Sequence, residues 1–142
     1  MVSLFTWAHS GLQHNRRMPL AYVIDRDQRL VVITGEYAEA SEWTDLLARV
    51  LSDPRRQPGF AFLRDLRGAT TPVDTATVIQ IMAVVRKFWP HLQPSRAAIL
   101  TPIDVDAAAL VAVADAERLP FRVFKSYDEA IQWLHQDESA DE

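Results

Sequence analysis

The sequence predicts a single α/β domain, and three observations lead to that prediction. The chain has 142 residues, the length of one domain of ordinary size. Short apolar runs rich in β-branched and aromatic residues alternate with segments whose apolar residues recur at helical spacing. Hydrophobic residues make up 49% and charged residues 24%, as in soluble globular proteins. The expected element order is ββαβαβαβα, with a mixed, mainly parallel five-stranded sheet and four helices.

Each predicted element rests on a local pattern. The strands are the β-branched and aromatic runs at residues 20–25, 29–35, 60–66, 96–100 and 121–125. A polar tight turn separates the first two strands and predicts a hairpin. The helices are the amphipathic segments at residues 43–51, 72–89, 104–117 and 127–135. Thr71 and Thr101, each followed by proline, are expected to be N-caps, and Pro90 is expected to end the longest helix.

The chain is divided into a domain at residues 19–135, an N-terminal extension at 1–18 and an acidic tail at 136–142. The sequence leaves open whether Phe5 and Trp7 of the extension pack on the domain. The apolar run of the extension has no basic stretch before it, and no segment approaches the roughly 20 apolar residues that span a bilayer. We therefore expect a cytoplasmic protein without a membrane span.

The composition excludes several classes of function. The chain has no cysteine, so disulfides, thiolate catalysis and cysteine-ligated metals are excluded. A net charge of −4 supplies no positive field for nucleic acid. The four glycines are too scattered for a phosphate-binding loop, the histidines lack metal-site spacing, and no serine lies in a nucleophile elbow. We expect a protein that is not an enzyme and that binds no cofactor or metal.

Three residues at predicted strand ends resemble the phosphoacceptor site of response-regulator receiver domains. Asp65, Thr101 and Lys125 stand where receivers carry their aspartate, threonine and lysine. A receiver also has an acidic pair after its first strand, whereas here Asp25 and Asp27 lie in the hairpin turn. Phosphoryl transfer needs that carboxylate cluster to hold Mg²⁺. A degenerate receiver-like phosphoacceptor is therefore the third functional alternative.

A second resemblance, to STAS domains and within them to the SpoIIAA-like anti-sigma-factor antagonists, covers residues 20–134. It rests on the element order, on Asp65-Leu66-Arg67-Gly68 after a strand and before a loop that enters a long helix, and on the sequence AILTP at 98–102. The closing short strand and helix also fit. The resemblance implies a STAS-like fold and a non-enzymatic regulatory module that binds a protein.

The same resemblance implies a docking surface in the loop and helix start after the third strand. The residues assigned to this partner-binding loop, or phospho-loop, are Asp65, Arg67, Gly68, Thr70, Thr71, Asp74 and Thr75. The antagonists carry a phosphorylatable serine there in a DSSG-like sequence, whereas this loop has threonines and no serine. Thr71 is either an N-cap or a phosphate acceptor, since a phosphate there would meet the positive helix end and Arg67.

The partner classes that remain are a protein, a second copy of the chain in a homodimer, and a lipid or small apolar ligand. The last follows from the likeness of SpoIIAA-like sequences to the SEC14-type lipid-binding fold. The aromatic residues that would line an apolar pocket, or else fill the core, are Trp43, Phe60, Phe62, Phe88 and Trp89.

Four arginines are spread over the predicted strands, one in each of strands two to five. They are Arg29, Arg64, Arg96 and Arg122. Buried parallel strands are usually continuous apolar runs, so these charges suggest that part of one sheet face, or the strand ends, is open to solvent or to a partner. The sequence leaves two interpretations, namely arginines paired with Asp65 and other carboxylates, or a surface that binds an anion or a protein.

Overall fold

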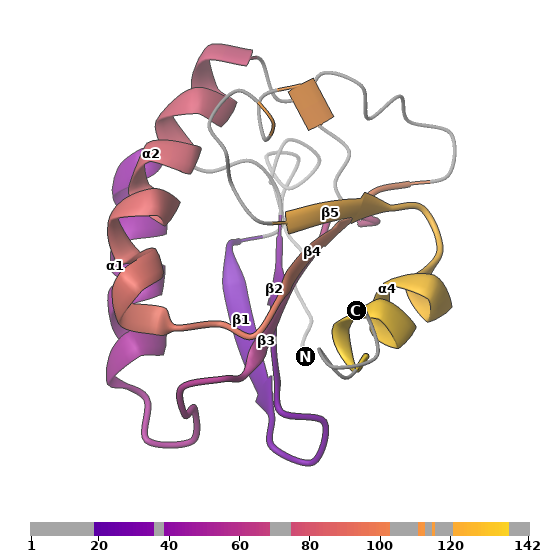
Figure 1. Cartoon of the computed structure of the whole chain (residues 1–142). Helices are drawn as coiled ribbons and strands as arrows, with labels where there is room; N and C mark the ends of the chain where they lie inside the picture. The colour runs from indigo at the N-terminus through magenta and orange to yellow at the C-terminus, as the bar shows by residue number, and fades with distance from the viewer. Residues whose placement is uncertain are drawn as a thin grey trace, which may run out of the picture.

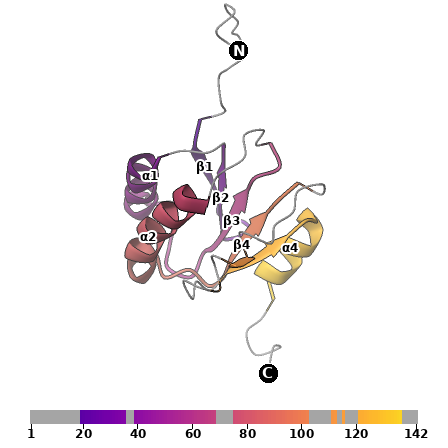
Figure 2. The ribbon, with the colours of Figure 1, turned by 90° about the horizontal axis from the view of Figure 1, so that it is seen from above.

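The computed structural model describes residues 19–35, 39–68, 75–102, 111, 112, 115 and 121–136. In this part of the chain, helices cover both faces of a five-stranded mixed sheet (Figure 1). Helices α1 and α2 lie side by side on one face and α4 lies on the other (Figure 2). The predicted α/β class is confirmed.

The strands are β1 (Ala21–Asp25), β2 (Leu30–Thr34), β3 (Ala61–Asp65), β4 (Ala97–Leu100) and β5 (Phe121–Phe124). They lie in the order β1-β2-β3-β4-β5. Strand β1 pairs antiparallel with β2, and the other three pairings are parallel. The hairpin and the mainly parallel sheet are therefore confirmed. Because β2 to β5 run the same way, their carboxyl ends meet at one edge of the sheet.

The described helices are α1 (Ala40–Ser52), α2 (Thr75–Leu92) and α4 (Tyr127–Leu134). Helix α1 forms because its apolar residues recur at helical spacing and are buried on one side: Trp43, Leu46, Leu47 and Val50. At its start, the Glu42 carboxylate accepts a hydrogen bond from the Glu39 N–H at 3.0 Å. At α4, Ser126 is the N-cap and accepts from the Glu129 N–H at 3.3 Å. Among the described residues no helix is both long and apolar enough to cross a membrane.

Side chains alternate along each strand, so the two faces of the sheet build separate cores. The core against α1 and α2 includes Val31, Ile33, Leu46, Val50, Phe62, Ile81 and Ala97. The core against α4 includes Leu30, Ala61, Leu63, Ala98, Leu100, Ala130 and Leu134. Consecutive residues of β3 therefore face opposite layers. At the end of that strand, Arg64 faces α1 and Asp65 faces α4.

The prediction that Pro90 ends the long helix is wrong by two residues. Pro90 lies inside α2, and the helix ends at Leu92. Proline's fixed φ is itself helical, so the chain completes its last turn after Pro90. The end comes at Gln93, whose φ of 48° is left-handed, and the Leu92 carbonyl accepts a hydrogen bond from Arg56 Nη1 at 2.8 Å.

Several expectations fall outside the described residues. They are the extension at 1–18, the N-cap Thr71, most of the helix at 104–117 and the tail after residue 136.

Candidate functional site

The carboxyl ends of β3, β4 and β5 bring the described part of the predicted loop to one edge of the sheet. Asp65 pairs in register with Leu100, which pairs in turn with Phe124. Ligands and partners of α/β proteins commonly bind beyond the carboxyl ends of parallel strands. The residues at and directly after these three positions therefore make up the candidate site.

Asp65 and Arg67 form a two-pronged ion pair at this edge. Arg67 donates from Nε to Oδ1 at 3.1 Å and from Nη2 to Oδ2 at 2.9 Å, and its backbone N–H donates to Oδ1 at 3.0 Å. Burial opposes ionisation of Asp65, but these hydrogen bonds outweigh it and lower the pKa of the carboxyl. The hydrogen bonds to Asp65 also raise the pKa of Arg67. The pair is charged at neutral pH and holds Arg67 in one orientation.

Arg67 also reaches the first residue of α4. Its guanidinium carbon lies over the Tyr127 ring, 5.1 Å from the ring centroid. The Arg67 side chain is 48% exposed and Tyr127 is 38% exposed, so the stack is presented to solvent. Sequence reasoning missed Tyr127 as a site residue. The only signal there was its position after a strand end, at the same edge of the sheet as Arg67.

The structure thus brings together Asp65 and Arg67, with the exposed Gly68 in the turn that follows. Thr70, Thr71 and Asp74 lie outside the described residues. Thr75 is the first residue of α2 as described, and its side chain is not among those described.

The trio that resembles a receiver site is arranged around the same edge. Thr101 is 3% exposed, and its hydroxyl donates to the Phe124 carbonyl oxygen at 3.4 Å. The Asp65 carboxylate is bonded by Arg67. In the described ranges, no group of three or more acidic, histidine or cysteine residues is placed to hold a metal ion.

The four arginines assigned to strands contact aromatic rings, although only Arg64 and Arg122 lie within strands. Arg29 and Arg96 directly precede β2 and β4, so their assignment to strands is wrong by one residue. The guanidinium-to-centroid distances are 5.7 Å for Arg29 over Phe60, 5.2 Å for Arg64 over Trp43, 4.8 Å for Arg96 over Trp133 and 5.2 Å for Arg122 over Trp133. Asp65 is bonded by Arg67 rather than by one of these four, so that part of the expectation is wrong. The reason is local, because a side chain two residues along the same chain reaches the carboxylate with both prongs.

The five aromatic residues considered for an apolar pocket belong to the core. Trp43, Phe60 and Phe62 are buried in the cluster against α1 and α2, and Phe88 and Trp89 pack against that cluster. Within the described residues they contribute to packing of the sheet against its helices.

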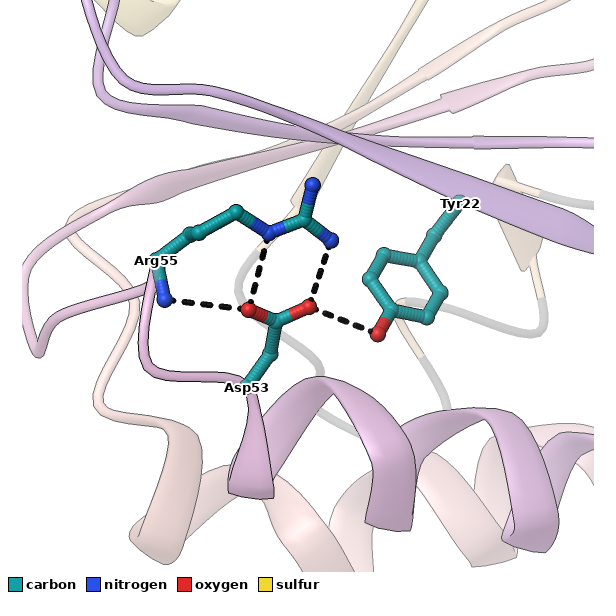
Figure 3. A network of polar contacts seen from close by, with 3 residues as sticks. All are labelled: Tyr22, Asp53 and Arg55. Atoms are coloured by element: carbon teal, nitrogen blue, oxygen red, sulfur yellow. Dashed lines mark hydrogen bonds and ion pairs between the residues drawn. The ribbon is translucent and has the colours of Figure 1, made fainter.

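A second polar cluster lies at the C-terminal end of α1 (Figure 3). Asp53 accepts hydrogen bonds from the Tyr22 hydroxyl at 2.8 Å and from Arg55 Nη2 at 2.7 Å, with two more from Arg55 Nε and N–H at 3.0 Å each. The hydrogen bonds from Arg55 hold the pKa of Asp53 well below its usual range. Burial is the main cause that raises the pKa of Tyr22, and the hydrogen bond to Asp53 raises it further. Neither group exchanges a proton near neutral pH, so the geometry is unsuited to acid–base catalysis.

An open groove of about 610 Å³ runs beside this cluster and is lined by Tyr22, Arg49, Asp53 and Arg55 among others. The Asp53 carboxylate is already bonded on both oxygens, and the Arg49 guanidinium lies 5.9 Å from the Tyr22 ring centroid. These contacts tie the end of α1 to the edge strand β1. We interpret the cluster as a structural clamp.

Comparison with known proteins adds no family assignment, because neither a scan against protein-family models nor a search of curated proteins finds a match to this chain.

Proposed function

We propose that this chain is a non-enzymatic regulatory module, resembling the STAS-like anti-sigma-factor antagonists, that docks a protein partner at the carboxyl edge of its sheet. The proposed contact surface, called here the β3 edge, comprises Asp65, Arg67, Gly68 and Tyr127, and continues into the loop through Thr70 and Thr71 to the start of α2.

The observation that carries this proposal is the Arg67–Tyr127 stack. Arginine and tyrosine are the residue types that most often dominate the energy of protein interfaces. Here both are partly exposed, and the ion pair with Asp65 already fixes the arginine. A partner that binds a fixed side chain loses less side-chain entropy than one that must order a free arginine. The β3 edge is therefore preorganised for binding.

We propose phosphorylation of Thr70 or Thr71 as the regulatory input. A phosphate carries about two negative charges at neutral pH and prefers arginine as its partner. On this loop it would compete with the Asp65 carboxylate for Arg67 and so change the surface that a partner meets. Mass spectrometry of the protein purified from its native host tests this step. Finding both threonines bare under every growth condition would contradict it.

The docking proposal is tested by photo-crosslinking in the native host. A photoreactive amino acid at position 127 is expected to give a discrete adduct with one protein, and Arg67→Ala is expected to abolish that adduct. The matched position is Val23, which is 61% exposed on the edge strand β1 and lies away from the β3 edge. The same adduct from both positions, or an adduct that survives Arg67→Ala in a folded protein, would argue against docking at this edge.

A further inference from the structure

Arg64 is a half-buried cation whose charge is not neutralised by the described residues around it. It lies on β3 in register with Ile33 of β2 and Ile99 of β4, on the face covered by α1 and α2. Its Nη1 donates to the Ile33 carbonyl oxygen at 3.3 Å. Within the described part of the chain, no carboxylate lies within ion-pair distance of its guanidinium. Burial lowers the pKa of Arg64 to about 10, so the side chain is still charged at neutral pH.

Trp43 adds a second donor without an acceptor. This residue of α1 is 6% exposed, and its indole Nε1 is fully buried without a hydrogen-bond partner in the structure described. The Arg64 guanidinium carbon lies 5.2 Å from the Trp43 ring centroid. Buried donors are nearly always satisfied in native proteins, so an unsatisfied one beside a cation needs an explanation.

Arg56 is a second buried arginine without an ion-pair partner among the described residues, and its Nε likewise lacks a hydrogen-bond partner there, but one of its nitrogens meets a helix end. Arg56 is 9% exposed, and its Nη1 donates to the Leu92 carbonyl oxygen at 2.8 Å, at the negative end of the α2 dipole. Arg64 has no such helix end as its partner in the described structure. It lies instead near the carboxyl ends of β2 and β3, beside the first turns of α1, which is where α/β folds hold ligands.

We propose that Arg64 and Trp43 bind the oxyanion of a small ligand, a carboxylate or a phosphate group, on the α1 side of the carboxyl edge. The guanidinium would supply paired N–H donors and the charge, and the indole N–H would supply a third donor. The indole ring beside the guanidinium suits a ligand with a flat or apolar body. This site lies on the opposite face of β3 from Asp65 and does not depend on the docking proposal.

The test is a titration of the full-length protein followed by the indole ¹H–¹⁵N signals of its four tryptophans. Trp43→Phe assigns the signal of interest. The probes are sodium benzoate and inorganic phosphate, each compared with sodium chloride at equal ionic strength. We expect the Trp43 signal to shift downfield and to saturate with at least one probe, because its N–H gains an acceptor. The Trp133 signal is expected to follow ionic strength alone.

Variants separate binding from general electrostatics. Arg64→Met is expected to weaken the apparent affinity by about tenfold or more, as for loss of a charged hydrogen-bond donor. The matched control is Arg122→Met, because Arg122 also lies 5.2 Å from a tryptophan ring but is exposed to solvent. That variant is expected to bind like the wild type. Thermal unfolding of both variants establishes that they are folded.

The outcomes are distinct. A response to benzoate alone identifies a carboxylate site, and a response to phosphate alone identifies a phosphate site. No saturable shift with either probe overturns the proposal, and so does an equal shift in folded Arg64→Met.

Discussion

Two Asp-x-Arg sequences form the same local ion pair, but each pair contacts a different tyrosine from a distant part of the chain. Arg55 bonds Asp53, and Arg67 bonds Asp65, each through Nε, Nη2 and the backbone N–H. In the first pair, the Tyr22 hydroxyl donates a hydrogen bond to Asp53. In the second pair, the partly exposed Arg67 stacks over the Tyr127 ring. The sequence predicted Asp65 and Arg67 as site residues from the family resemblance. It could not separate the two motifs, because their different tyrosines come from distant parts of the chain.

Arg67→Ala is expected to raise the pKa of Asp65 toward its usual range, since the two side-chain hydrogen bonds that help to hold it down are lost while the one from the backbone N–H remains. A folded-state pKa below the unfolded value stabilises the fold above the unfolded pKa, and this contribution disappears as the pH falls through the folded pKa. The variant is therefore expected to lose up to about 1 kcal/mol at neutral pH, reduced by the exposure of the pair, and most of this difference is expected to disappear in acid, below the folded-state pKa of Asp65. Carboxyl ¹³C titration and denaturation at several pH values measure both effects. A destabilisation that is independent of pH would contradict the ion-pair account.

Arg64→Met is expected to leave the protein at least as stable as the wild type, with a gain of up to about 2 kcal/mol. The pKa of Arg64 is lower in the folded state, so the unfolded chain holds the proton more tightly and the charged form opposes folding at neutral pH. Removing a half-buried charge that has no carboxylate within ion-pair distance among the described residues relieves this cost, against a loss of about 1 kcal/mol of cation–π attraction. Urea denaturation without added anions measures the difference. A loss of several kcal/mol would show that Arg64 is a structural residue.

At the scale of the element, helix and strand ends depend on single backbone positions that periodicity does not reveal. The apolar spacing of α1 was enough to predict its buried side and its end before Pro54, because every signal there is local. The sequence pattern placed the end of α2 at Pro90, but the helical turn continues through Pro90 to Leu92. The helix ends at Gln93, which has a positive φ. The positive φ of Gln93, and so the helix end, could not be predicted from the sequence, because glutamine seldom adopts a positive φ.

Gln93→Gly is expected to stabilise the protein by about 1 kcal/mol, because glycine adopts the left-handed φ without a steric cost. The matched control is Gln80→Gly at an exposed position inside α2, which is expected to destabilise the protein by about the same amount. Chemical denaturation of both variants is the measurement. A destabilised Gln93→Gly would mean that the side chain, rather than the backbone, ends the helix.

Gly35→Ala is expected to be far more damaging than Gly59→Ala, although both glycines have a positive φ. A Cβ at position 35 would overlap the Pro19 carbonyl, a backbone group that cannot move aside, whereas at position 59 the nearest atom is the mobile Arg29 Nη2 at 3.6 Å. We expect a loss of about 3 kcal/mol or more at Gly35 and of about 1 kcal/mol at Gly59. Thermal unfolding compares them, and equal losses would show that φ alone matters.

At the scale of the whole molecule, the sequence predicted the order of the elements but not which distant parts would meet. Alternation along the chain identified the strands, the hairpin and the three described helices. The contacts that link the layers were not predictable, because they join residues far apart in sequence. Examples are Arg64 with Trp43, Arg67 with Tyr127, and His135 Nε2, which lies 3.0 Å from the Gln28 carbonyl oxygen.

These long-range contacts divide the carboxyl edge into two surfaces on opposite faces of β3. The α4 side presents the exposed Arg67–Tyr127 stack, which suits a protein partner. The α1 side holds the half-buried Arg64 beside Trp43, which suits a small anion. One strand can serve both because consecutive side chains point to opposite faces.

The most direct test of the central claim is the affinity of the crosslinked partner, once purified, for matched variants, measured by titration calorimetry. Arg67→Ala is expected to weaken binding by about tenfold or more, as for loss of an interface arginine. Arg55→Ala removes an arginine with the same local ion pair at the far end of α1 and is expected to bind like the wild type. Equal affinities for the wild type and folded Arg67→Ala would contradict docking at the β3 edge.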